Sequence, residues 1–405
     1  MGWFFSSLKS CRLPSRQSRR APKRNRSLIL EDLEGRRPLS HAIQSFVTLP
    51  VTSLNASNII SGPDGDLWVG VNSINPNSDL IEKIGLDGSV TSFPVPVPEN
   101  APVQFMIVSL TTGPDGNVWF VADFINSTGT DGQVVIGNVA PTGHVTEFPP
   151  IPVPAGQNAS VNWIVSGSGG DLWFGYVVAD TAYQSQNFIG RVTTAGVVTL
   201  FPISTIGPAA HAAGGLSLAT GADGNLWFTE GFGKDFVFGR MSPSGVVSRF
   251  PIRSQAPGAP GEVGNGPNSS LIVTVENAKG RNEVFQVSTA GAITRYKVPE
   301  AISDAFSNYL GSADGSLWFA DTSGAFKLGR ITASGVATTY NLSKLVHSRF
   351  HDFDSMAVGP DGNLYVLDPA LPAVNHTTTV YRLSPSELPP VRSVRGHTGG
   401  HPKVT

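Results

Sequence analysis

A polar turn followed by a short, unbroken run of apolar residues recurs along the chain. In its clearest copy a Gly-Ala-Asp-Gly-Asn turn, residues 221–225, leads into Leu226, Trp227 and Phe228. Aspartate and glycine are typical of tight turns, where glycine supplies the positive φ that other residues avoid. The second residue of each apolar run is termed the marker residue, and the seven markers are Trp68, Trp119, Trp173, Trp227, Ile272, Trp318 and Tyr365. Neighbouring markers are 45 to 54 residues apart, a period typical of β-propeller blades.

A second repeated phrase lies between successive copies of the first. It runs from Ile189 to Pro202 and again from Phe238 to Pro251, each time with a central glycine turn and a Phe-Pro ending. The two phrases together therefore predict two hairpins in each repeat unit, which make four antiparallel strands. The apolar runs of the first hairpin do not alternate with polar residues, as expected for strands buried on both faces. The Phe-Pro ending suits an outermost strand, because proline cannot donate a hydrogen bond to a ladder.

The two ends of the repeat region complete each other. The seventh unit stops at Pro385 without a fourth strand, and Ile43 to Pro50 has the pattern of a fourth strand without its unit. Pairing the two closes a ring and removes two open sheet edges. The sequence therefore predicts an all-β fold, a seven-bladed β-propeller of four-stranded blades closed by an N-terminal outer strand. We place the propeller at residues 42–387, with a leader at 1–41 and a tail at 388–405 that we expect to be disordered.

The spacing of the markers is uneven. Trp173 follows Trp119 by 54 positions, but Ile272 follows Trp227 by 45. We expect the extra residues to lengthen the loops of the early blades. A binding surface formed by these loops would then lie mainly on blades one to three.

Charge separates the leader from the propeller. The chain has 28 Lys and Arg against 30 Asp and Glu, and ten of the basic but three of the acidic residues fall within residues 1–42. The propeller is therefore acidic and lacks the basic face that nucleic-acid binding requires. No apolar stretch reaches the roughly 18 residues of a membrane-spanning helix. The single cysteine, Cys11, excludes an intrachain disulfide.

The end of the leader carries a motif. Leu30 to Ser40 reads LEDLEGRRPLS and resembles the LExLExRxLLS-type motif near the N-terminus of many large bacterial surface and secreted proteins. The resemblance implies a bacterial protein that is secreted or held at the cell surface through an atypical export motif. A short amphipathic helix is the alternative interpretation.

The two repeated phrases, GPDG-[ND]-LWF and IGR-[IV]-T-x-x-G-x-V-T-x-FP, resemble those of the virginiamycin B lyase, or streptogramin lyase, family over about residues 43–387. The resemblance implies a seven-bladed propeller that opens the ester of a cyclic depsipeptide antibiotic by eliminating a C–O bond. In that family a histidine is the base and Mg²⁺ assists. Such a reaction needs a base of suitable pKa and positive charge beside the developing enolate.

The family's site positions transfer to this chain by register from the marker residues. The positions of the two family histidines hold Ser307 and Asp354, that of the metal-linked glutamate holds Asp368, and that of a substrate-contacting tyrosine holds Ser57. His351 lies three residues before Asp354, so these two residues are the candidate catalytic pair. The alternative is that His351 is an ordinary surface-loop histidine.

Three carboxylates form a candidate metal site. Asp321 and Asp368 each follow a marker residue by three positions, and Asp354 begins the first strand of the last blade. We expect the three to meet at one mouth of the central channel, where carboxylate oxygens suit Mg²⁺ or Ca²⁺. A solvated acidic rim without metal is the alternative. The aspartates of the repeated turns and the marker tryptophans are expected to be structural.

Two functions remain open. The first is an exported C–O lyase of the virginiamycin B lyase type, acting on a cyclic depsipeptide or another ester. The second is a non-catalytic propeller that binds a ligand or a protein through its top-face loops. The expected partner is a small molecule, a cyclic peptide or a protein, and the expected state is a monomer.

Overall fold

The computed structural model describes residues 43–49, 53–73, 79–96, 104–125, 133–153, 156–180, 184–208, 216–230, 237–250, 260–276, 282–296, 306–312, 314–321, 327–332, 336–341, 355–368 and 378–388. All of them belong to the second of two compact units into which the chain divides, Pro38–Thr405. The leader motif and residues 389–405 of the expected tail lie outside the described residues, so disorder and export stay predictions.

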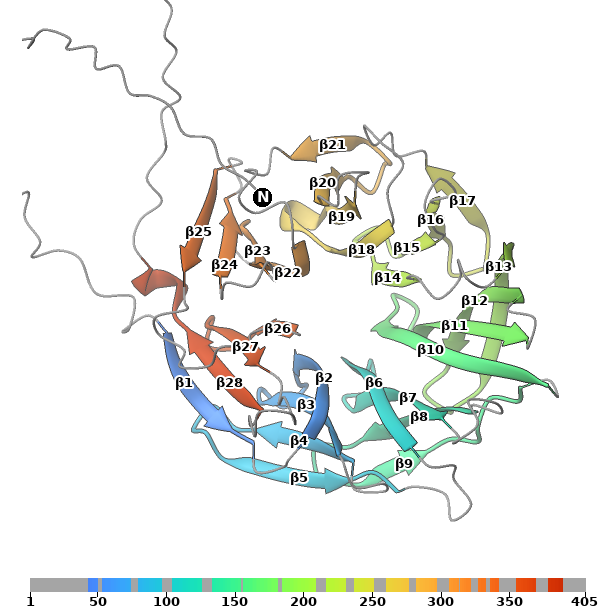
Figure 1. Cartoon of the computed structure of the whole chain (residues 1–405), viewed down its shortest axis with the longest axis horizontal. Helices are drawn as coiled ribbons and strands as arrows, with labels where there is room; N and C mark the ends of the chain where they lie inside the picture. Colours follow the sequence, from blue (N-terminus) through green and yellow to red (C-terminus); the bar gives the residue numbers. More distant parts are fainter. Residues whose placement is uncertain are drawn as a thin grey trace, which may run out of the picture. The chain divides into compact units, whose positions relative to one another are not determined.

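The described residues form seven sheets, each of four antiparallel strands, arranged in a ring (Figure 1). Six of these blades take their strands in chain order, from the centre outward. Blade 1 consists of β2 (Ser53–Ser61), β3 (Leu67–Ser73), β4 (Leu80–Ile84) and β5 (Val90–Pro94). Blade 2 consists of β6 (Gln104–Thr112), β7 (Val118–Ile125), β8 (Gln133–Val139) and β9 (Val145–Glu147). Blade 3 consists of β10 (Gln157–Ser166), β11 (Leu172–Asp180), β12 (Gln184–Val192) and β13 (Val198–Pro208). Blade 4 consists of β14 (Ser217–Thr220), β15 (Leu226–Glu230), β16 (Val237–Met241) and β17 (Val247–Phe250). Blade 5 consists of β18 (Pro260–Asn265), β19 (Leu271–Glu276), β20 (Asn282–Val287) and β21 (Ile293–Tyr296). Blade 6 consists of β22 (Phe306–Gly311), β23 (Leu317–Asp321), β24 (Lys327–Ile331) and β25 (Ala337–Asn341).

The seventh blade combines the two ends of the propeller. It contains β26 (Ser355–Val358), β27 (Leu364–Asp368) and β28 (Thr379–Leu383), and its outermost strand is β1 (Ile43–Thr48). β1 runs antiparallel to β28, with Ile43 opposite Leu383 and Thr48 opposite Thr379. The predicted seven-bladed fold and its closure by an N-terminal strand are therefore confirmed.

The first strand of each blade faces the centre of the ring. Each of these inner strands contacts the inner strand of the next blade, in the order β2, β6, β10, β14, β18, β22, β26 and back to β2 (Figure 1). The second strands lie behind them, and β3, β15 and β27 are buried along their whole length. Burial on both faces explains why these strands lack polar alternation.

The marker tryptophans fill the space between blades. Trp68 of blade 1 is fully buried and packs with Phe105 and Phe120 of blade 2. Its indole Nε1 donates to Asp64 Oδ1 in the repeated turn at 3.0 Å. The same bond joins Trp119 to Asp115 at 2.9 Å and Trp227 to Asp223 at 3.1 Å. These turn aspartates and tryptophans have the structural role expected of them.

Blade 3 differs from the others in strand length. Its strands β10 to β13 have 10, 9, 9 and 11 residues, whereas β14 to β17 of blade 4 have 4, 5, 5 and 4. Part of the extra length predicted for early loops is therefore paired backbone. Continuing a ladder satisfies N–H and C=O groups that a longer loop would leave to water.

Candidate functional site

One end of the ring carries the candidate residues. The inner strands begin and the second strands end at this end, which we term the top face, while the Asp-Gly turns lie at the other end. His351 and Asp354 belong to residues 342–354, which lie outside the described residues. The predicted roles of His351 and Asp354 therefore stay predictions.

The serine candidates belong to two inner strands. Ser57 of β2 is buried, and its Oγ accepts a hydrogen bond from the backbone N–H of Gly70 at 3.1 Å. This contact is internal to blade 1, so Ser57 supports the backbone of its own sheet. Ser307 lies in β22 opposite Ala320, and its side chain is outside the described part of the structure.

Two carboxylate candidates end neighbouring second strands, as their register predicts. Asp321 is the last residue of β23, and its side chain is not described. Asp368 is the last residue of β27, opposite Thr379, and only 1 % of its surface is exposed. Burial, with the nearby charge of Asp368, raises the pKa of Tyr381 to about 12. Among the described residues, no three His, Cys, Asp or Glu side chains are grouped as a metal site.

Five of the seven inner strands share a β-bulge that the sequence did not predict. In β2, β6, β10, β18 and β22 the register against the second strand shifts at the same level, between Ala56 and Ile59 in β2 and between Pro260 and Val263 in β18. A bulge bends the strand and re-aims the extra side chain. Here it directs side chains from the inner strands toward the next blade or toward the channel.

One position at this level of the inner strands joins successive blades, in strands with and without the bulge. It lies ten residues before the marker, and we term it the rim position: Asn58, Ser109, Trp163, Ser217, Glu262, Asn308 and Ser355. In four blades a short polar side chain at this position bonds the backbone of the next inner strand, always at the residue nine before that blade's marker. The pairs are Asn58 with Leu110 N and O at 2.6 and 2.8 Å, Ser109 with Ile164 N at 3.4 Å, Ser217 with Val263 N and O at 3.0 and 3.3 Å, and Ser355 with Ile59 N at 3.1 Å.

A second set of bonds lies one level higher. The residue four after the marker is Asn72 in blade 1 and Asp123 in blade 2. Asn72 accepts from Ile107 N at 2.7 Å and donates to Ile107 O at 3.1 Å, and Asp123 accepts from the equivalent Val161 N at 2.9 Å. Burial raises the pKa of Asp123 to about 7. Asp123 therefore acts in the contact between blades 2 and 3, away from the channel lining.

The inner strands enclose a channel of about 460 Å³ to which all seven blades contribute. Its walls are mainly apolar, with Ile60, Val165, Leu310 and Ala357 from four different blades. The described lining begins at the rim position, where Asn58, Ser217 and Ser355 supply polar groups. The channel therefore has apolar walls with polar side chains at the rim position, and Ser61, Thr111 and Asn265 add polar groups toward its other end.

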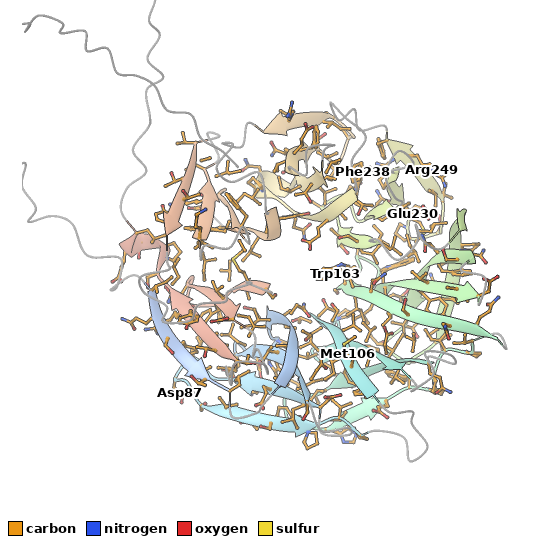
Figure 2. All side chains as sticks on the ribbon, viewed as in Figure 1. Asp87, Met106, Trp163, Glu230, Phe238 and Arg249 are labelled. Carbon is orange, nitrogen blue, oxygen red and sulfur yellow. The ribbon has the colours of Figure 1, made fainter. Side chains whose placement is uncertain are left out.

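Two of the seven rim positions hold neither serine nor asparagine. Trp163 of β10 and Glu262 of β18 line the channel, and Glu262 is the one charged residue among the described residues of the lining. Figure 2 shows Trp163 at the inner edge of blade 3, beside the central opening. Sequence analysis did not single out either residue. The available signal was their register, because the described blades otherwise carry serine or asparagine at this position.

The chain matches one protein family over the whole propeller. A model of the virginiamycin B lyase family matches residues 31–181 and 133–394. No curated protein matches the sequence significantly.

Solved structures show a similar fold at low identity. A structure described as YCF48 bound to D1 peptide has a TM-score of 0.54 and 12 % identity, over 83 % of this chain and 94 % of that one. Puromycin hydrolase has a TM-score of 0.55 and 15 % identity, over 86 % of this chain and 57 % of its own length. The chain thus spans little more than half of that hydrolase, and both likenesses concern the fold alone.

In the part of the chain that the structure describes, no helix has the length and apolar character to span a membrane.

Proposed function

The chain belongs to the virginiamycin B lyase family, and from that premise we propose that it binds a cyclic, peptide-like ligand at the top mouth of its channel without opening the ligand's ring. The two family histidine positions hold Ser307 and Asp354. A serine hydroxyl is no base near neutral pH, and an ordinary aspartate, with a pKa near 3.9, is a weak one. The fold of the family is retained while both histidine positions are replaced.

The observation that carries the proposal is the channel. Its shaft of about 460 Å³ has apolar walls and a polar mouth, the combination found in small-molecule sites. Inter-blade hydrogen bonds at Asn58, Ser217 and Ser355 hold that mouth in place. A rigid mouth loses little conformational entropy on binding. We propose that the ligand covers the mouth and inserts one apolar group into the shaft.

A type B streptogramin is the probe for this proposal. Ile60 lines the shaft, so Ile60→Trp should fill the space for the inserted group and weaken binding by about tenfold or more. Ile60→Val, which keeps the shaft open, should bind like the wild type. Equilibrium dialysis measures both. The proposal fails if the wild type does not bind, or if Ile60→Trp binds as tightly as Ile60→Val.

The second candidate is the C–O lyase, favoured by the family match across all seven blades. In this alternative Asp354 and His351 would move the proton, and Asp321, Asp354 and Asp368 would hold Mg²⁺ or Ca²⁺, which would supply positive charge beside the enolate. Asp368 fits that role poorly, because its carboxylate is buried inside blade 7 and outside the channel lining. For this reason we favour binding over elimination.

A further inference from the structure

We infer that Trp163, at the rim of the channel, selects a ligand that presents an aromatic ring, and that this ring packs on the exposed part of the indole. The inference rests on the ligand binding proposed for the mouth, and it names the group that is recognised there. Trp163 belongs to β10, the inner strand of blade 3, and lines the channel. Figure 2 shows it beside the central opening.

Trp163 differs in exposure from the other tryptophans of the described residues. The five marker tryptophans are at most 5 % exposed, and each belongs to an apolar cluster of the core. Trp163 is partly exposed, and it belongs to none of the apolar clusters that the described residues form. An indole that does not contribute to a core is available to pack on a ligand.

The indole N–H of Trp163 has no role in the fold. In Trp68, Trp119 and Trp227 this group donates to an aspartate four residues earlier. Four residues before Trp163 stands Ala159, whose side chain has no acceptor, and no other described residue accepts from this indole. The N–H is therefore a donor for a ligand, and a carbonyl of the ligand would accept it.

The backbone on both sides of Trp163 is fixed. The register of β10 against β11 shifts between Val161 and Ile164, so Trp163 lies in the bulge. Val161 donates its N–H to Asp123 of blade 2 at 2.9 Å, and Ile164 donates to Ser109 of the same blade at 3.4 Å. Contacts on both sides of the bulge therefore hold the strand in place, and its backbone does not need to reorganise when a ligand packs on the indole.

The neighbouring rim positions do not supply a second large side chain. Blades 2 and 4, on either side of blade 3, hold Ser109 and Ser217, whose hydroxyls are buried and bonded to the next inner strand. Tyr309 is the other aromatic residue of the described lining, and its hydroxyl donates to Ile272 O at 3.2 Å. At the rim position, the aromatic group that the described residues offer a ligand is thus the indole of Trp163.

This partner favours an aromatic ring over an aliphatic ring of the same size. Aromatic pairs adopt offset-stacked or edge-to-face arrangements, and their attraction adds to the gain from area burial. An amide carbonyl beside the ring would accept the indole N–H. The ligand class is therefore a peptide-like molecule that carries an aromatic side chain next to an amide carbonyl.

Binding of N-acetylphenylalanine amide and N-acetylcyclohexylalanine amide to the full chain tests the inference. The two probes share their polar groups and differ in whether the ring is aromatic, and ligand-observed NMR titration measures both dissociation constants. Trp163→Leu, which removes the aromatic partner, should lower the affinity for the phenyl probe relative to the cyclohexyl probe by about threefold or more. Trp163→Phe, which keeps a ring, should retain most of the wild-type ratio.

Oxidative footprinting of the wild type, read by peptide mass spectrometry, needs no variant and stands if a substitution impairs folding. The bound phenyl probe should slow modification at Trp163 and leave Trp173, which is buried, unchanged.

Three results would overturn the inference. They are no binding of the phenyl probe to the wild type, the same affinity ratio in Trp163→Leu as in the wild type, and no protection of Trp163 by the bound probe. Since neither probe is a streptogramin, the two proposals fail separately. Streptogramin binding with an unchanged ratio in Trp163→Leu removes only the role of Trp163, whereas probe binding through Trp163 without streptogramin binding removes only the cyclic ligand.

Discussion

Removing residues 1–49 should lower the free energy of unfolding by about 5 kcal/mol, whereas removing residues 1–41 should leave it unchanged. The longer deletion takes away β1, and with it Ile43 and Leu49, which are 6 % and 1 % exposed. Burying one such side chain contributes about 1.5–3 kcal/mol. The longer deletion also removes Phe46, whose ring lies 5.2 Å from that of Tyr365, and it exposes the edge of β28. Since domains are stable by about 5–15 kcal/mol, this loss approaches the whole margin.

Urea denaturation of the two shortened proteins measures the difference. If the longer deletion does not fold, Leu49→Ala in the full chain provides a milder test, with an expected loss of about 3 kcal/mol. Equal stability of the two shortened proteins would show that β1 does not close the ring.

Asp123→Asn should stabilise the protein by about 2–4 kcal/mol at pH 8 and by much less at pH 4. In the folded state burial raises the pKa of Asp123 to about 7, against an ordinary value of 3.8. Between these two values the folded protein binds the extra proton, so wild-type stability falls as pH rises and levels off above pH 7. Asparagine carries no charge and can both accept and donate, as Asn72 does at the equivalent position.

Thermal unfolding of the variant and the wild type from pH 4 to pH 8 measures this difference in stability. The difference in stability between Asp123→Asn and the wild type should increase from pH 4 upward and become constant above pH 7. Asp87→Asn is the matched control. Hydrogen bonds from Ser89 lower the pKa of Asp87, so this exposed carboxylate is ionised in both states above pH 5 and adds no slope there. A wild-type stability that does not decline between pH 4 and pH 7 would contradict the buried, uncharged form of Asp123.

The periodic features of the fold follow from the sequence. A polar, glycine-containing turn before each marker residue, and the missing fourth strand after Pro385, were enough to predict seven blades and their closure by β1. The reason is physical: each blade buries its apolar run only by stacking on its neighbours, so the repeat and its count determine the ring.

The inter-blade contacts do not follow from local patterns. The bond from Asn58 to Leu110 joins residues 52 apart, and the bond from Asp123 to Val161 joins residues 38 apart. Each joins side chains and backbone of different blades, and in β2, β6 and β10 the strand register is also shifted by a bulge, which has no distinct composition. Trp163 and Glu262 were missed for this reason, because only their register against the marker residue sets them apart. The substrate role of Ser57 stays a prediction, and the hydrogen bond that its hydroxyl accepts from Gly70 of its own blade could not be predicted from the sequence.

The most direct test of the proposed function is whether the protein opens a type B streptogramin. Elimination leaves the mass of the antibiotic unchanged and hydrolysis adds one water, so chromatography with tandem mass spectrometry distinguishes both from the intact ring. With stoichiometric protein and millimolar Mg²⁺, we expect the ring to stay closed while the antibiotic remains bound. A ring-opened isomer that forms only with protein, and disappears in Asp354→Asn, would contradict it and establish the lyase.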